Sequence, residues 1–165
     1  GFLVMNELEN LNILDNPKRP FVVIMGGSKI SDKIGVISSL IKQADYILVG
    51  GAMAFTFLEA KGYRVGDSLF EEKHIDYCKY LLKHYGDRII LPTDLYGTYD
   101  LNKNPDVILQ DVDMIPNNFI GLDIGDETIK LFKSILKNTK TVFWNGPLGA
   151  YEYEKFRYEL KWKKY

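Results

Sequence analysis

The sequence predicts a doubly wound α/β fold, with a mainly parallel sheet and helices on both faces in a Rossmann-like three-layer arrangement. Short apolar runs alternate with segments of helical periodicity along the 165 residues, which is typical of chains built from βαβ units. Three of the runs end in glycine-bearing turns, as strands of parallel sheets often do. The chain is also 46% hydrophobic, which is enough for a proper core.

The elements follow one another in a regular order. Leucines at near-helical spacing, ended by Asp15-Asn16-Pro17, predict a helix over residues 2–14 that enters the domain from elsewhere. Apolar runs bounded by turn residues predict strands, at residues 21–25, 46–49, 88–91, 107–112 and 141–144. Helical periodicity predicts the helices between them, at about residues 32–43, 52–61, 71–85 and 127–137.

Residues 19–33 form the most informative segment. They join a buried strand to the turn Gly26-Gly27 and then to a helix that carries Lys29 and Lys33. Glycines let the backbone turn with positive φ and let a ligand approach closely, while a helix start exposes N–H groups and a positive dipole end. The segment therefore predicts a phosphate site with both lysines on one face. A βα turn with two solvated lysines is the alternative that this motif leaves open.

Three strands end in turns of small residues: Gly26-Gly27, Gly50-Gly51 and Asn145-Gly146-Pro147. Open α/β sheets bind ligands beyond the carboxyl ends of their strands. We therefore expect the turns to lie along one edge and to form one nucleotide site, although each turn alone is equally compatible with a structural role.

Composition argues against several other classes. The net charge is −1, and the one basic cluster is at residues 161–164, so we expect no nucleic-acid partner. No apolar run approaches the length of a membrane span, and we expect no membrane contact. Cys78 is the single cysteine, which indicates a core thiol in a reducing, cytoplasmic protein. His74 and His84 have no ligand spacing, so no metal site is predicted among them.

Five blocks in order resemble the C-terminal, nucleotide-binding lobe of phosphoglycerate kinases. They are residues 19–33, 50–58, 66–69, 121–125 and 142–149. The opening residues 1–8 are similar to the inter-lobe helix of that family, so the resemblance covers residues 1 to about 156. It implies a connector helix at residues 1–16 and a truncated nucleotide-binding lobe at residues 17–165.

The resemblance also implies an activity. Members of the family transfer a phosphoryl group between 1,3-bisphosphoglycerate and ADP, giving 3-phosphoglycerate and ATP in glycolysis. By residue-by-residue match, Lys29 would act in catalysis by stabilising the transferring group, Lys33 would hold the nucleotide phosphates beside Gly27, and Asn145 would donate its amide near the terminal phosphates. The adenine slot would be lined by Gly50, Gly51, Leu69, Gly121, Leu122 and Pro147. Glu152 would accept hydrogen bonds from the ribose hydroxyls.

Some of these residues have ordinary alternatives. Leu69 and Leu122 could equally be core residues, and Glu152 could be a surface residue. Nothing in the sequence resembles the family's Gly-Gly-Gly-Asp segment, which helps to hold phosphate and magnesium, or its N-terminal lobe with the basic site for phosphoglycerate. We therefore expect Mg²⁺ only through nucleotide phosphates, a monomeric parent protein, and a chain that by itself binds ADP or ATP without transfer.

A nicotinamide dehydrogenase domain is the alternative from another class, because alternating strands and helices would permit one. It is disfavoured, since no G-x-G-x-x-G follows the first buried strand and no acidic residue is placed after it for a ribose hydroxyl.

Overall fold

The computed structural model describes residues 3–5, 16–102 and 105–149, which form two sheets and the helices that cover them. The larger sheet is parallel throughout, with the strand order β1-β8-β2-β3-β4. Its strands are β1 (Leu3–Met5), β8 (Thr141–Asn145), β2 (Phe21–Met25), β3 (Tyr46–Val49) and β4 (Ile89–Ile90). The expected mainly parallel sheet is confirmed.

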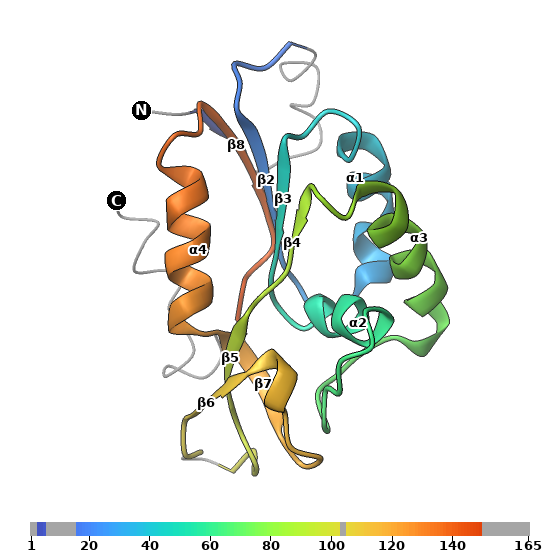
Figure 1. Cartoon of the computed structure of the whole chain (residues 1–165), viewed down its shortest axis with the longest axis vertical. Coiled ribbons are helices and arrows are strands. Elements are labelled where there is room, and N and C mark those ends of the chain that lie inside the picture. Colours follow the sequence, from blue (N-terminus) through green and yellow to red (C-terminus); the bar gives the residue numbers. More distant parts are fainter. Residues whose placement is uncertain (1–2, 6–15, 103–104, 150–165) are drawn as a thin grey trace.

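Strand β2 occupies the middle of this sheet, and all five of its residues are buried. Helices α1 (Ile34–Leu40), α2 (Met53–Ala60) and α3 (Ile75–Tyr85) cover one face of the sheet, and α4 (Asp126–Leu136) covers the other (Figure 1). Because both faces of β2 are covered, its sequence is a continuous apolar run instead of an alternating one. Each face has its own hydrophobic cluster.

A second, antiparallel sheet lies beyond the carboxyl ends of the parallel strands (Figure 1). It consists of β5 (Asp94–Thr98), β6 (Ile108–Asp111) and β7 (Ile120–Ile124), in the order β6-β5-β7. A third hydrophobic cluster, which includes Phe55 and Leu58 of α2 and Phe119 beside β7, packs this sheet against α2. The sheet therefore places β7 next to the glycine turns that end the parallel strands.

Several expected elements differ in the structure. The helix expected over residues 2–14 is wrong at Leu3–Met5, where the chain forms β1 and pairs with β8. These residues belong to an apolar run, which suits a strand, whereas the remaining leucines of the pattern lie outside the described residues. The division into connector and lobe stays a prediction. The strand expected over residues 107–112 is the antiparallel β6, and neither β5 nor β7 was expected.

The helix expected to begin at Asp32 also differs. It starts as a 3-10 turn, η2 (Ile30–Lys33), and continues as α1. A second 3-10 turn, η3 (Glu72–His74), precedes α3, and η4 (Val112–Met114) follows β6.

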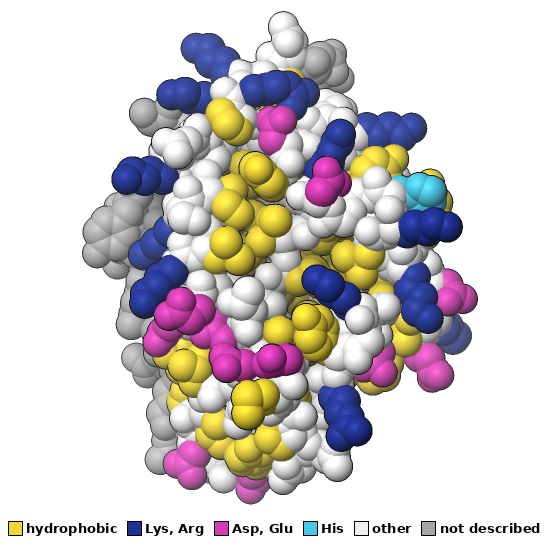
Figure 2. Space-filling view, in the orientation of Figure 1, with side chains coloured by type: hydrophobic (Ala, Val, Ile, Leu, Met, Phe, Trp, Pro, Cys, Tyr) yellow, Lys and Arg dark blue, Asp and Glu magenta, His cyan; other side chains and the backbone are white. Residues whose placement is uncertain are grey.

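The face in Figure 2 has acidic and basic side chains interspersed around apolar ones, with a short acidic band across its lower part. None of the helices in the described part of the chain combines the length and apolar character that a bilayer span needs. Cys78 of α3 is buried in the hydrophobic cluster on that face of the sheet, as expected of a core thiol. Its burial, together with the nearby negative charge of Glu71, raises the pKa of the thiol to about 12.

Candidate nucleotide site

The three turns that end β2, β3 and β8 are joined by backbone hydrogen bonds. The Gly27 N–H donates to the Pro147 carbonyl at 2.8 Å, and the Gly51 N–H donates to the Leu148 carbonyl at 3.0 Å. The Gly27 carbonyl in turn accepts from the Met53 N–H at 3.0 Å, at the start of α2. The expected convergence of the three turns at one edge of the sheet is confirmed.

Glycine is required where these turns touch. Gly51 has a φ of +67°, a conformation that other residues adopt at a cost. A Cβ at this position would lie 2.6 Å from both the nitrogen and the oxygen of Gly27. The turns can therefore interlock only if position 51 has no side chain. The Gly27 N–H is occupied by its hydrogen bond to the Pro147 carbonyl.

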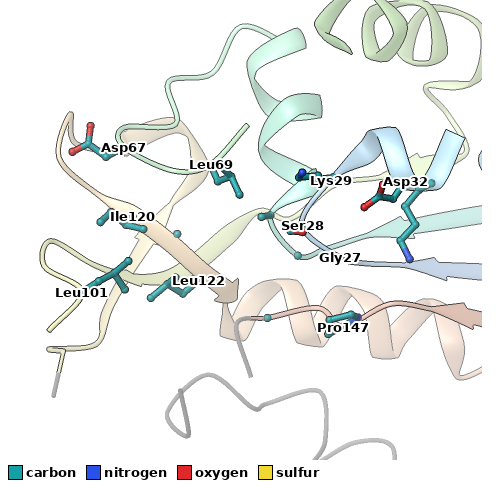
Figure 3. Close-up of a pocket in the computed structure, with 15 residues that line it drawn as sticks. Gly27, Ser28, Lys29, Asp32, Asp67, Leu69, Leu101, Ile120, Leu122 and Pro147 are labelled. Carbon is teal, nitrogen blue, oxygen red and sulfur yellow. The ribbon is translucent and has the colours of Figure 1, made fainter. Parts of the chain in front are cut away.

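An open pocket of about 670 Å³ lies above the interlocked turns. It extends from the end of β2 to the antiparallel sheet (Figure 3). Its lining consists of Gly27, Ser28, Lys29, Asp32, Lys33, Gly51, Ala52, Asp67, Leu69, Leu101, Ile120, Gly121, Leu122, Pro147 and Gly149.

The pocket has two chemically different ends. In Figure 3, Ser28, Lys29 and Asp32 lie at the end next to β2, while Leu101, Ile120 and Leu122 lie at the end next to β7. We call the first the lysine end and the second the apolar end. Asp67 lies on the same side as Ile120 (Figure 3). A cavity with lysines at one end and mainly apolar walls at the other matches a ligand that joins an anionic group to a planar ring.

Lys33 connects two of the turns at the lysine end. Its Nζ donates to Oδ1 of Asn145, a residue 112 positions away at the end of β8. Burial lowers the pKa of Lys33 from its usual value, although the neighbouring Asp32 carboxylate acts in the opposite direction. A partly desolvated cation gains strongly from a bound anion, since less water competes for its charge. This hydrogen bond uses the side-chain oxygen of Asn145, whereas the donor role expected of Asn145 would use its side-chain amide nitrogen.

The start of η2 is already capped by an acidic side chain. The Ser31 N–H donates to Oε1 of Glu71 at 3.1 Å, so the expectation of unpaired N–H groups at this helix start is wrong at Ser31. Burial acts to raise the pKa of Glu71, but the hydrogen bonds from Ser31 and the charge of His74 hold it below its usual value. The helix start is therefore stabilised from within the protein.

A buried hydroxyl supports the apolar end. Ser68 Oγ accepts from the Gly121 N–H at 2.9 Å, which ties the turn before Leu69 to β7. The ring of Phe55 packs against Gly121 where a Cβ would otherwise be. Leu69 is 58% exposed, so it lies at the rim of the pocket and not in the core.

The structure brings most of the predicted site residues into this one pocket. Those that line it are Gly27, Lys29, Lys33, Gly51, Leu69, Gly121, Leu122 and Pro147. Gly50 does not line it, because its Cα faces Leu148 and Ile124, and Asn145 reaches it only through Lys33. Glu152 lies outside the described residues. The roles of all these residues in ligand binding stay predictions.

Sequence reasoning missed several lining residues. Asp67 lies within the block 66–69 that carried the family resemblance, and Ile120 directly precedes Gly121. Both could have been predicted, because each is next to a residue that was assigned to the site, or within the same block. Leu101 is in an irregular segment after β5 that has no periodic signal, so only the fold reveals it.

Comparison with known proteins assigns the chain to a family. The family model described as phosphoglycerate kinase matches residues 1–159. The chain belongs to the phosphoglycerate kinase family. The phosphoglycerate kinase of Corynebacterium kroppenstedtii is 48% identical over 157 residues, and that of Lactobacillus acidophilus is 49% identical over 159 residues. Each match covers 94% of this chain but 39% of the relative. The chain thus spans about two fifths of the length of these phosphoglycerate kinases.

Solved structures agree with this assignment. The phosphoglycerate kinase of Coxiella burnetii superposes with a TM-score of 0.86 at 31% identity, covering 91% of this chain and 40% of that one. The phosphoglycerate kinase of Pyrococcus horikoshii superposes with a TM-score of 0.77 at 23% identity, covering 92% of this chain and 40% of that one. The second likeness concerns the fold alone.

Proposed function

We propose that the pocket binds ADP or ATP, and that the chain supplies the nucleotide side of phosphoryl transfer between 1,3-bisphosphoglycerate and ADP. The observation that carries this proposal is the pairing of a lysine end and an apolar end in one pocket, at the carboxyl ends of β2, β3 and β8. The phosphate chain would lie at the lysine end and the adenine at the apolar end. Membership of the phosphoglycerate kinase family supports the same reaction.

The residues at the lysine end suit phosphoryl transfer. This chemistry needs charge neutralisation and alignment of the reacting groups more than covalent participation by the protein. Lys29 would stabilise the transferring group, and Lys33 would hold the nucleotide phosphates, with Asn145 keeping the Lys33 ammonium in place. Ribose binding by Glu152 belongs to the same proposal and rests on the family match.

Magnesium would enter with the nucleotide. Mg²⁺ in kinase sites is held by substrate phosphates together with one or two carboxylates. Asp32 at the lysine end is a carboxylate that faces the same pocket, so the residues present fit a nucleotide-borne Mg²⁺. When bound, the ion would neutralise charge on the phosphate oxygens.

We further propose that the parent protein acts in glycolysis as a cytoplasmic monomer.

A second candidate applies to the 165-residue polypeptide by itself, which would bind nucleotide without transferring phosphate. The chain spans 39% of its relatives' length, and the family resemblance implies that phosphoglycerate binds on another lobe. Incubation of the purified polypeptide with MgATP and 3-phosphoglycerate, coupled to a dehydrogenase that consumes the product, distinguishes the two. A rate equal to the no-enzyme blank supports binding alone, and turnover that survives removal of trace host kinase supports the complete reaction.

Calorimetric titration of the polypeptide with ADP and with adenosine tests the proposed function. Lys33→Ala should weaken ADP binding by about 1.5–3 kcal/mol, since a charge-assisted hydrogen bond is lost, and should leave adenosine binding unchanged. Lys42→Ala removes an exposed lysine outside the pocket and serves as the control. An unchanged dissociation constant for ADP in a folded Lys33→Ala protein would contradict the assignment.

A further inference from the structure

Glu71 lies outside the pocket but is connected to its lysine end. It directly precedes η3 and the helix α3, and its side chain is 22% exposed. It is not among the residues that line the pocket. Any effect of Glu71 on a ligand there must therefore pass through another residue.

The contacts of Glu71 bridge α2 and η2. Its backbone N–H donates to Oγ1 of Thr56 at 3.0 Å, and Thr56 is buried on α2. Its Oε1 accepts from the Ser31 N–H at 3.1 Å, and Oε2 is 3.7 Å from Nε2 of His74. One residue thus anchors the middle of the lysine-bearing turn to a helix in the core.

The lysine-bearing turn has no cap of its own. The 3-10 turn η2 is only four residues long, and the residue that caps it, Lys29, makes no side-chain capping hydrogen bond. Lys33, which caps the following helix α1, makes none either. Glu71, forty positions along the chain, supplies the missing acceptor midway between the two lysines. Short 3-10 segments have poor hydrogen-bond geometry of their own, so such an anchor strongly affects where the lysines lie.

We propose that Glu71 is a positioning residue for nucleotide phosphate, which holds Lys29 and Lys33 at the lysine end of the pocket through its hydrogen bond to the Ser31 N–H. The inference rests on the proposed function, because it names the phosphate chain as the part of the ligand that depends on Glu71. The proposed adenine contacts are Leu69, two residues of β7 and the turns at Gly51 and Pro147, and none of these groups takes part in the Glu71–Ser31 hydrogen bond.

Positioning and simple electrostatics make different predictions for Glu71→Gln. A carboxylate near a phosphate site repels the anion, so if charge alone mattered, its removal would tighten ADP binding. Glutamine keeps a side-chain oxygen that can accept from Ser31, so positioning predicts affinity close to that of the original protein. Glu71→Ala removes the acceptor, and positioning then predicts weaker ADP binding.

Calorimetric titration of the full 165-residue chain with ADP and with adenosine provides the first test. Glu71→Ala should weaken ADP binding by about tenfold or more, since small misplacements of aligned groups are costly. Adenosine binding should be unchanged, Glu71→Gln should resemble the original protein for both ligands, and Glu72→Ala, which removes the neighbouring exposed acid, should change neither. Equal losses for ADP and adenosine, tighter ADP binding by Glu71→Gln, or unchanged ADP binding by Glu71→Ala would each overturn the proposal.

Hydrogen exchange of the backbone amides in residues 28–34 provides a test that needs no nucleotide. Glu71→Ala should speed exchange in this segment while peptides from β2 and α4 stay protected, and Glu71→Gln should not. Unchanged exchange would overturn the inference. If the original chain binds neither ADP nor adenosine, the proposed function fails, yet the exchange result still decides whether Glu71 holds the turn. Should Glu71→Ala fail to fold, Glu71→Asp, which withdraws the carboxylate by one methylene, replaces it in both experiments.

Discussion

The lysine end and the apolar end of the pocket are built in different ways. At the lysine end, three turns from distant parts of the sequence are locked by backbone hydrogen bonds, and Gly51 fits only because it has no Cβ. At the apolar end, side chains such as Leu122 project from an antiparallel sheet toward an open cavity. The comparison teaches that residues at the lysine end are constrained first by packing of the backbone, whereas those at the apolar end are constrained by what the cavity contains.

Adding a methyl group at Gly51 is the strongest test of the backbone packing at the lysine end. Gly51→Ala should lower the free energy of unfolding by about 3–5 kcal/mol, because a strained φ is combined with overlap against Gly27. Gly62 has a φ of +97°, and a Cβ added there would meet nothing within 4 Å. Gly62→Ala therefore isolates the strain and should cost about 1 kcal/mol. Urea unfolding of both variants measures the difference. Equal losses would show that the interlocked turns tolerate a side chain.

A somewhat smaller effect is expected where the antiparallel sheet joins the rest of the fold. Asp94 of β5 is 1% exposed, and its carboxylate accepts from the N–H groups of Glu127 and Thr128 at the start of α4. Asp94→Ala leaves the buried Thr128 donor and the partly buried Glu127 donor without an acceptor and should cost about 2–4 kcal/mol of stability. Asp126→Ala removes an exposed acid from the same helix start and should cost about 0.5 kcal/mol. Thermal or urea unfolding that ranks the two variants equally would refute the capping role of Asp94.

Leu122→Ala tests the apolar end without disturbing the backbone. The side chain is partly exposed at the pocket, so its truncation should change stability little but weaken binding of both ADP and adenosine by about 1–2 kcal/mol. Calorimetry with the two ligands measures this. A loss confined to ADP would place the base elsewhere, because adenosine carries the base without the phosphates.

The smallest expected effect concerns pH at the lysine end. Burial lowers the pKa of Lys33, so the ammonium loses its proton at a lower pH than an exposed lysine would. The proposed contact with phosphate needs the protonated form, so ADP affinity should fall as pH rises toward the usual lysine pKa of 10.5. The same pH titration of Lys33→Met gives the contribution of all other groups to the dissociation constant, and the difference between the two profiles belongs to Lys33. If both proteins show the same pH profile of the dissociation constant, Lys33 does not contact phosphate.

Much of the parallel half of the fold could be predicted from the sequence. The apolar runs of β2 and β3 and the glycine turns after them are local signals that survive in the structure. In the antiparallel half the run of β6 was predicted as a strand, but β5 and β7 were not, because they contain residues that are rare in strands. Gly97 of β5 and Gly121 of β7 leave room for the rings of Phe119 and Phe55, and Asp94 caps α4. The same residues that make these strands hard to predict from the sequence therefore pack them against the rest of the protein.

Residues at the site also differ in whether a local sequence signal predicts them. Lys29 and Lys33 were predictable because they follow a glycine turn within one short segment. The capping of Ser31 by Glu71 was not, because forty positions separate donor and acceptor and an acidic residue before a helix is ordinarily a surface residue. Long-range hydrogen bonds of this kind leave no periodic trace in a sequence.

The position of β8 in the sheet has a consequence for synthesis of the chain. Although β8 is the last described strand, it lies between β1 and β2, and its turn supplies the carbonyl of Pro147 to Gly27. While the chain emerges from the ribosome, β2 can pair with β3 early, but its other edge stays open until residues 141–145 appear. Such distant pairing slows folding. The pocket at the ends of these strands therefore cannot form on the nascent chain until that late strand has inserted.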